Sequence, residues 1–507
     1  MKFDSILKMA GLVMNHEGAQ AYAMTPELEL YTAVVTASLS DLFYEKRDER
    51  VERIANLVGK VSPEFVARLA VYTRTEMHLR SIPLLLLVEL AKVHNGDDLV
   101  ARAVEKTVQR ADEIMELLMC YQWRNPSRDA RKKLNKLSRQ LQKGLQQAFN
   151  HFDEYQFAKY DRDNISVKLR DALFVVHPKA KDEQQQFLFD MIASQQLSVP
   201  YTWETELSAL GQQHFENDAE RRKAFQAKWE ELVASGKLGY MALMRNLRNL
   251  LEADVSRAAM MVVNRRLSDP AQVAKSKQLP FRYLSAYREM EKVNSLHTQA
   301  VMSALEAAVR HSAANIKGFD ENTRVLLASD VSGSMWQSIS PRITVQYYDI
   351  GLLLSMLLKS RCHQVIAGIF GDTWKAVNMP ADNILMATSQ LRRMEGEVGY
   401  STNGHKVIDW LISHKIQMDK VMMFTDLQMW DSSRSDKSLK ASWMDYKKMA
   451  PQARLYLFDL AGYGQSPLRI TDEDVYLIAG WSDRIFDVLA AIDDGRNALH
   501  LINKVEI

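Results

Sequence analysis

Five oxygen-bearing side chains in the second half of the chain have the types and the spacing of a metal-binding set. They are Asp330, Ser332, Ser334, Thr402 and Asp426. The first three share one turn, Asp-Val-Ser-Gly-Ser, while the fourth lies in a glycine-flanked loop and the fifth directly follows an apolar run. Hydroxyl and carboxylate oxygens with only two negative charges suit a hard divalent ion that keeps some of its water. We therefore expect a divalent metal, Mg²⁺, as the cofactor.

A simpler interpretation needs no metal. Asp and Ser often cap the first turn of a helix, and Asp330 with its two serines could do so for the helix that follows. This alternative accounts for the first cluster but not for Thr402 or Asp426.

The sequence lacks the signatures of the common catalytic sites. Ser332 does not lie in a Gly-x-Ser-x-Gly elbow, and there is no phosphate-binding loop and no His-Glu-x-x-His motif. The histidines in this half are scattered, as core or surface histidines usually are. We expect a protein that is not an enzyme.

Strands and helices in alternation must position the five oxygens. Short apolar runs of buried-strand type lie at 324–329, 364–370, 420–425, 454–458 and 475–479, with helical patterns between them. This order predicts a doubly wound parallel sheet, a Rossmann-like α/β domain, over residues 321–507. Ligands of such sheets bind outside the carboxyl ends of the strands, where these oxygens fall.

The first part of the chain has a different period. Residues 1–320 show one helical pattern after another, separated by short cap signals such as Ser62-Pro63 at a start and Asn95-Gly96 at an end. Helices joined by short loops pack as antiparallel neighbours. A few hundred residues of them without strands predict an α-solenoid.

Charge is nearly balanced overall, with 65 Lys and Arg against 63 Asp and Glu, a net charge of +2. A whole-molecule field cannot attract a polyanion, so binding to nucleic acid needs a local patch. A cationic strip spaced by three or four residues predicts one face of a helix: Arg128, Lys132, Lys136, Arg139 and Lys143. Such a strip can neutralise several phosphates, although a charged run is more often only a solvated face.

Further cations extend this basic character along the chain. They are Lys159, Arg162, Arg170, His177, Arg245 and Arg248. An acidic stretch from Asp182 to Glu220 offsets them, which explains the near-neutral total.

Cysteine usage and hydropathy indicate a cytoplasmic protein. Cys120 and Cys362 stand far apart, so no disulfide framework is encoded. The N-terminus lacks the pattern of a signal peptide, and the most apolar stretch, residues 82–91, is too short to span a bilayer. We expect no membrane contact.

Two sets of residues resemble known families. The five oxygens, in this order, resemble the metal-ion-dependent adhesion site of von Willebrand factor A domains, whose ion accepts a carboxylate from a partner. Nearly the whole chain resembles the TROVE proteins, the Ro autoantigen family. The residues that carry this second resemblance are Tyr72-Thr-Arg74, Met77 to Leu85, Tyr121-Gln-Trp123, Lys159-Tyr160, Met241 to Asn249, Leu279-Pro-Phe281 and the Asp330 to Ser334 turn.

The resemblance to the Ro family implies a fold and a function. It implies a ring of HEAT-like repeats closed by the A domain, monomeric, with single-stranded 3′ ends of misfolded or immature noncoding RNA in its basic hole. A small structured Y RNA would bind outside, where Lys159, Arg162 and His177 match the family's contacts. Because the spacing departs slightly from the family's, Arg170 could replace Arg162. In the A domain, Asn403 stands where an acid commonly follows the threonine.

The bacterial branch of the family implies an adaptor that brings RNA to an exoribonuclease such as polynucleotide phosphorylase through a Y-like RNA. A different class of function stays open beside it. The protein could be an interaction module whose metal site holds an acidic partner, with the helices as structure alone and no RNA.

Overall fold

The computed structural model describes residues 12–15, 19–37, 47–126, 136–161, 165–312, 319, 322–340, 343–378, 380, 382–429, 438–470, 474–480, 485–493 and 497–507. The chain forms two compact units, Met1–Val51 with Trp229–Ala498, and Glu52–Lys228 with Leu499–Ile507. We call the first the mixed unit and the second the helical unit. None of the helices in the described residues has the length and apolar character needed to cross a membrane.

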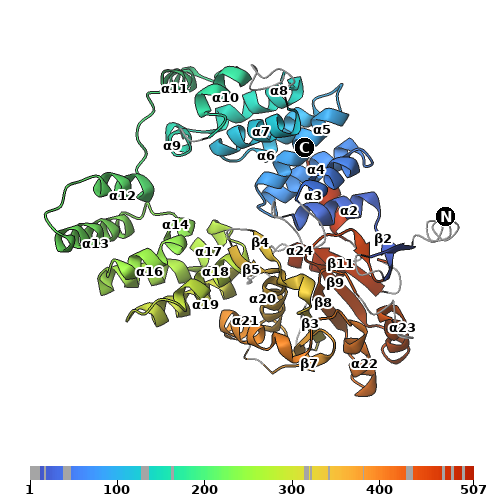
Figure 1. The fold of residues 1–507 in the computed structure, drawn as a ribbon. Helices are drawn as coiled ribbons and strands as arrows, with labels where there is room; N and C mark the ends of the chain where they lie inside the picture. Colours follow the sequence, from blue (N-terminus) through green and yellow to red (C-terminus); the bar gives the residue numbers. More distant parts are fainter. Residues whose placement is uncertain are drawn as a thin grey trace. The chain divides into compact units, whose positions relative to one another are not determined.

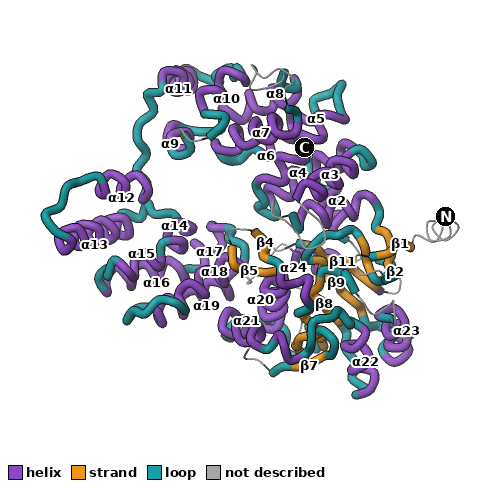
Figure 2. Tube along the Cα trace, in the orientation of Figure 1, coloured by secondary structure: helices purple, strands orange, loops and turns teal. Residues whose placement is uncertain are grey.

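Helices make up the helical unit, as the sequence predicted (Figure 2). They are the second part of α3 (Arg47–Val58), then α4 (Pro63–Thr75), α5 (Ser81–Val93), α6 (Leu99–Thr107), α7 (Ala111–Arg124), α8 (Arg139–Ala148), α9 (Glu154–Ala158), α10 (Leu169–Val176), α11 (Glu183–Ser194), α12 (Trp203–Gly211) and the first part of α13 (Asp218–Ala234). The predicted cap at Ser62 is confirmed, since its hydroxyl accepts a hydrogen bond from the Phe65 amide at 3.2 Å. Helix α8 packs closely on α6 because Gly144 has no side chain: a Cβ there would lie 2.5 Å from the Ala101 carbonyl oxygen.

The predicted helix through the cationic strip is wrong in its extent. Helix α8 begins at Arg139, so Lys136 lies before it and does not share its face. The Tyr121 hydroxyl donates a 2.8 Å hydrogen bond to the Lys136 carbonyl, a group that a longer helix would need for its own bond. Arg128 and Lys132 lie outside the described residues.

The α/β part of the mixed unit confirms the predicted Rossmann-like fold. Its six-stranded sheet has the order β11 (Val475–Ala479), β9 (Arg454–Asp459), β8 (Lys420–Thr425), β3 (Arg324–Asp330), β6 (Gln364–Phe370) and β7 (Trp374–Ala376). All neighbours are parallel except β6 and β7. Figure 1 shows the helices that accompany these strands: α20 (Tyr347–Lys359), α21 (Ile384–Arg393), α22 (His405–Ser413), α23 (Leu439–Met449) and α24 (Ile485–Asp493).

The beginning of the described chain also belongs to this α/β part, which corrects its assignment to the helical domain. Strands β1 (Leu12–Met14) and β2 (Gln20–Ala23) form a hairpin that pairs with β10 (Gln465–Ser466). The Asn15 side-chain amide donates to the Met429 carbonyl at 2.9 Å, and the Tyr31 hydroxyl of α2 (Pro26–Val35) donates to the Ala479 carbonyl at 3.3 Å. Buried contacts with residues more than four hundred positions away therefore decide where this segment packs.

Six helices that the sequence placed in the helical domain belong to the mixed unit as well. They are α14 (Tyr240–Arg245), α15 (Leu247–Glu252), α16 (Arg257–Ser268), α17 (Pro270–Ser276), α18 (Pro280–Met290) and α19 (Thr298–Ser312). Glu306 on α19 accepts hydrogen bonds from the Leu385 and Met386 amides at the start of α21, at 3.1 and 2.8 Å. The compact units thus differ from the predicted division into residues 1–320 and 321–507, because these helices are bonded to the sheet's own helices.

Candidate functional site

Four of the five predicted metal ligands lie at the carboxyl ends of two neighbouring strands, and Thr402 lies in a loop before α22. Strand β3 ends at Asp330, and its neighbour β8 ends at Thr425, directly before Asp426. All five side chains are buried, with at most 6% of their surface exposed. The Ser332 and Ser334 hydroxyl oxygens stand 3.3 Å apart. The parallel sheet therefore gathers the first cluster and Asp426 at one edge, as predicted.

Hydrogen bonds hold the two carboxylates in place. Asp330 Oδ1 accepts from the Ser332 amide at 2.8 Å, and Asp330 Oδ2 accepts from the Thr425 hydroxyl at 2.7 Å. Asp426 Oδ1 accepts from the Gln428 amide at 3.0 Å. Thr425 is a further candidate residue of this site that was not predicted from the sequence, although a hydroxyl as the last residue of a buried strand was a usable signal.

The loop that carries Thr402 lies against the turn that carries Asp330, Ser332 and Ser334. The Gly333 amide donates to the Tyr400 carbonyl at 3.0 Å, and the Asn403 amide donates to the Gly371 carbonyl at 3.1 Å. A Cβ on Gly371 would lie 2.2 Å from the Gly399 carbonyl oxygen, so the close approach of the Thr402 loop to the end of β6 needs glycine at position 371. Asn403, where the resemblance implies an acid, also donates from its side-chain amide to the Asp372 carbonyl at 3.4 Å.

Burial and like charge disturb the titration of this site. Burial, and then the nearby charge of Asp426, raise the pKa of Asp330 to about 7, although hydrogen bonds from Ser332 and Thr425 oppose the shift. A bound cation would remove this cost, because it neutralises both carboxylates. Within the described ranges no three His, Cys, Asp or Glu residues form a metal-binding group, so the donor set is two acids with hydroxyls. That set fits Mg²⁺.

Helix capping explains the turn less well. The segment that follows is a single 3₁₀ turn, Gly333–Trp336, and the Ser332 side chain makes no capping bond to it. The buried hydroxyls of Ser332 and Ser334 face each other instead. The capping alternative also leaves the convergence with Asp426 unexplained.

A third buried carboxylate lies one strand further along the same edge. Asp459 ends β9, and its Oδ1 accepts from the Ala461 and Gly462 amides at 3.0 and 2.6 Å. Burial raises its pKa to about 6. The sequence did not predict that Asp459 lies beside the site, because only the pairing of β9 with β8 places it there.

Two exposed aromatic side chains stand beside the turn that carries Asp330, Ser332 and Ser334. The rings of Trp336 and Tyr400 meet edge to face with their centroids 5.2 Å apart. Trp336 ends the 3₁₀ turn, and the Tyr400 carbonyl accepts the Gly333 amide. The sequence did not single out either ring, so the pair is the third feature that the structure adds to the site, after Thr425 and Asp459.

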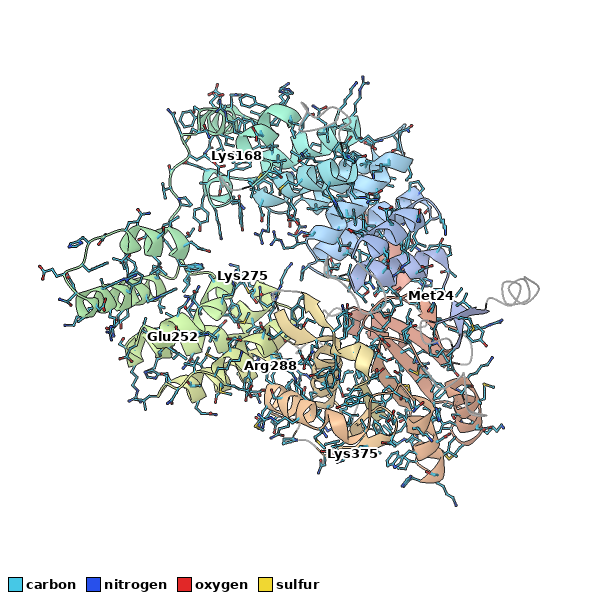
Figure 3. The ribbon with its side chains drawn as sticks, in the orientation of Figure 1. Met24, Lys168, Glu252, Lys275, Arg288 and Lys375 are labelled. Atoms are coloured by element: carbon cyan, nitrogen blue, oxygen red, sulfur yellow. The ribbon has the colours of Figure 1, made fainter. Side chains whose placement is uncertain are left out.

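The predicted RNA-binding residues fall into three described groups. Arg139 and Lys143 are exposed on α8. Lys159, Arg170 and His177 are exposed around α9 and α10, whereas Arg162 lies outside the described residues. Arg245 and Arg248 are exposed at α14 and α15. Figure 3 labels Lys168, which directly precedes α10 and is two residues before Arg170 of the second group.

The two arginines of the third group have different surroundings. Arg248 forms an ion pair with Glu252, with its Nε 2.7 Å from Oε1. Arg245 has no acidic partner among the residues that the structure describes. Burial, and then the positive charge of Arg245, lower the pKa of Arg282 on α18.

Comparison with known families decides the identity. The sequence model of the TROVE domain matches residues 29–196 and 191–330. The chain belongs to the TROVE family. A second model, the Ro60 vWA domain, matches residues 324–492 and so covers the five oxygen ligands. The TROVE family is known for binding RNA rather than for catalysis.

Solved and curated relatives agree with a TROVE fold. The crystal structure of the Deinococcus radiodurans Ro (RSR) protein is similar, with a TM-score of 0.58 and 18% identity over 91% of this chain and 99% of that one. Telomerase protein component 1 of Mus musculus is 39% identical over 99 residues, and that of Rattus norvegicus is 23% identical over 310 residues. These matches span 20% and 48% of the TROVE chain but only 3% and 12% of the two telomerase components.

Proposed function

We propose that this TROVE protein binds noncoding RNA. Its ligands would be small structured Y-like RNA and the single-stranded 3′ ends of misfolded or immature RNA. The observation that supports this most directly is the surface at α9 and α10, where exposed cations lie beside exposed aromatic rings within the region matched by the TROVE model. Such a surface attracts phosphates by charge and unpaired bases by stacking.

The protein would act as a scaffold rather than as an enzyme. A Y-like RNA bound at Lys159, Arg162 or Arg170, and His177 would carry an exoribonuclease such as polynucleotide phosphorylase to the bound RNA. The closed ring, the monomeric state and the cytoplasmic location stay predictions beside this role.

A magnesium ion would complete the A domain. Asp330, Ser332, Ser334, Thr402 and Asp426 would hold it, and the ion would supply a positive site that accepts a carboxylate from a partner. Thr425 orients Asp330 toward this role through its 2.7 Å hydrogen bond. The raised pKa of Asp330 supports the proposal, because uncompensated charge is buried here without a cation.

A protein-interaction module without RNA is the second candidate. The exposed Trp336 and Tyr400 pair beside the carboxylate site favours it, because aromatic residues are enriched where proteins bind one another. In this case the cations on α8 to α10 would only be solvated.

Purification of the protein from the cells that encode it, followed by sequencing of the co-purified RNA, separates the two candidates. The RNA proposal predicts enrichment of small structured RNAs and of RNAs with unpaired 3′ tails over a mock purification. RNA no richer than in the mock sample would contradict it and favour the interaction module.

A further inference from the structure

Two aromatic side chains of the helical unit lie exposed where the fold does not need them. Phe174 is 50% exposed on α10, and Tyr155 is 47% exposed on α9. The apolar face of α10 is already supplied by Leu169, Ala172, Leu173 and Val176, which are buried. Phe174 is not one of the residues that form this buried face, and the exposed half of its ring is available to a ligand.

Each of these rings has a cation one helical turn away. The Arg170 guanidinium carbon lies 5.6 Å from the centroid of the Phe174 ring, and the Lys159 Nζ lies 5.9 Å from the centroid of the Tyr155 ring. Lys159 Nζ is also 5.6 Å from the ring of Tyr160. The i, i+4 spacing of both pairs places ring and charge on the same face of the chain. A cation at this distance from a ring is held by its π electrons.

A single loop ties the two pairs together. Arg170 Nη1 donates to Gln195 Oε1 at 3.1 Å, and three residues later the Ser198 amide and hydroxyl donate to Glu154 Oε1 at 3.1 and 2.6 Å. Glu154 is the neighbour of Tyr155. The loop 195–198 thus fixes α9 and α10 relative to each other and leaves both rings exposed.

The acids of this surface are engaged in internal bonds. Glu154 accepts from Ser198, and Asp171 Oδ2 accepts from the Lys168 amide at 3.3 Å as part of the start of α10. Lys159 and Arg170 have no acidic partner among the described residues, since their contacts are with rings and with the Gln195 amide oxygen. The surface therefore presents flat apolar rings with positive charge beside each.

We propose that Phe174 and Tyr155, with Arg170 and Lys159 beside them, form a stacking platform for unpaired nucleotides. This inference rests on the proposed RNA-binding function and narrows it to single-stranded segments at α9 and α10. A base would stack on each ring, and the cation beside the ring would bind the adjoining phosphate. A duplex cannot use the platform, because its bases are stacked on each other.

The test compares single-stranded and double-stranded RNA on the full chain. The probes are a fluorescein-labelled twelve-nucleotide oligouridine and a blunt RNA duplex of the same length, with anisotropy as the readout. We expect Phe174→Ala to weaken binding of the single strand by about tenfold to a hundredfold, since each stacked base contributes that much. Duplex affinity and the salt dependence should stay as in the wild type, because no charge is removed.

Two further variants test whether the loss of affinity comes from the ring at position 174. Phe174→Trp should retain single-strand affinity, because indole stacks as well as phenyl. Phe187→Ala removes a phenylalanine of α11 that is 67% exposed and has no cation at its ring in the described residues, so it should change nothing.

Three outcomes would overturn the platform, and they differ in meaning. Unchanged single-strand binding in Phe174→Ala would reject the platform while the proposed function stands. Equal loss with single strand and duplex would show a general defect rather than stacking. A wild-type protein that binds neither probe would reject the platform and the RNA-binding function together.

Discussion

Arg288 and Asp349 form a buried ion pair with two hydrogen bonds, from Nη1 to Oδ2 at 2.7 Å and from Nη2 to Oδ1 at 2.5 Å. Arg288, labelled in Figure 3, belongs to α18 in the region matched by the TROVE model, and Asp349 belongs to α20 in the region matched by the vWA model. The pair therefore joins a helix of one family region to a helix of the other.

The Asp349 carboxylate also accepts a hydrogen bond from the segment that precedes α20. Asp349 Oδ2 accepts from the Gln346 amide at 2.8 Å, and the next residue, Tyr347, donates its amide to the Gln337 carbonyl at 3.1 Å. Hydrogen bonds thus connect α18, through Asp349, to the segment that follows the 3₁₀ turn Gly333–Trp336.

Removal of Arg288 should strongly destabilise the mixed unit. Arg288→Met removes both hydrogen bonds to the buried Asp349 and leaves it only the more distant Arg392, whose Nε lies 3.9 Å from Oδ1. The loss should approach about 3–5 kcal/mol, which is the cost of a broken buried pair. The control is Arg324→Met, whose partner Asp419 and whose own side chain are each 41% exposed, so that the loss should stay below about 1 kcal/mol. Urea unfolding at neutral pH measures both. Equal losses in the two variants would show that the buried pair has no special role.

Mg²⁺ should stabilise the protein more at pH 8 than at pH 5.5. The folded-state pKa of Asp330 is raised from 3.8 to about 7, so the stability that its proton provides is complete below about pH 4 and is lost as the pH rises to 7. Mg²⁺ needs the deprotonated carboxylate and competes with that proton. Differential scanning fluorimetry with and without Mg²⁺ checks the shift at both pH values.

Asp330→Ala should abolish the Mg²⁺-dependent shift in melting temperature. The matched control is Asp445→Ala, which removes an exposed carboxylate from α23 and should leave the shift as in the wild type. A variant at Asp330 that still responds fully to Mg²⁺ would place the ion elsewhere.

Arg245 should contribute more to RNA binding than Arg248. Arg248 is paired with Glu252, so it would have to give up this ion pair to bind a phosphate. Arg245 lies near Arg282 and has no acidic partner among the described residues, so it can bind a phosphate without breaking an ion pair. We expect Arg245→Gln to weaken binding by about tenfold and Arg248→Gln by about twofold. Anisotropy with a single-stranded RNA at fixed salt measures both. The reverse order would rule out Arg245 as a phosphate contact.

The sequence was sufficient to bring the candidate ligands of two strands together, because parallel sheets have a simple geometry. Residues that follow neighbouring parallel strands meet at one edge, so Asp330 and Asp426 could be placed together without a structure. Thr425 and Asp459 were missed because their role depends on which strand lies beside which, and this pairing is a property of the folded sheet.

The errors in the helical prediction have a related cause. The apolar residues of segment 12–35 do not reveal which part of the protein they pack on. Contacts far apart in the sequence, such as the hydrogen bond from Asn15 to Met429, place the segment on the α/β part. The cationic strip has helical spacing, but the Tyr121 hydroxyl binds the Lys136 carbonyl and the helix starts three residues later. Local pattern cannot report a tertiary hydrogen bond.

Binding of an RNA with a single-stranded tail is the measurement that bears most closely on the proposed RNA-binding function. The measurement is the dissociation constant, at several salt concentrations, of a small structured RNA with a single-stranded 3′ tail, for the wild type and for Lys159→Glu, with Lys448→Glu on α23 as the exposed control. Our account predicts salt-dependent binding that Lys159→Glu weakens by about tenfold or more and that Lys448→Glu leaves unchanged. Absence of binding by the wild type at about 0.1 M salt would contradict the account.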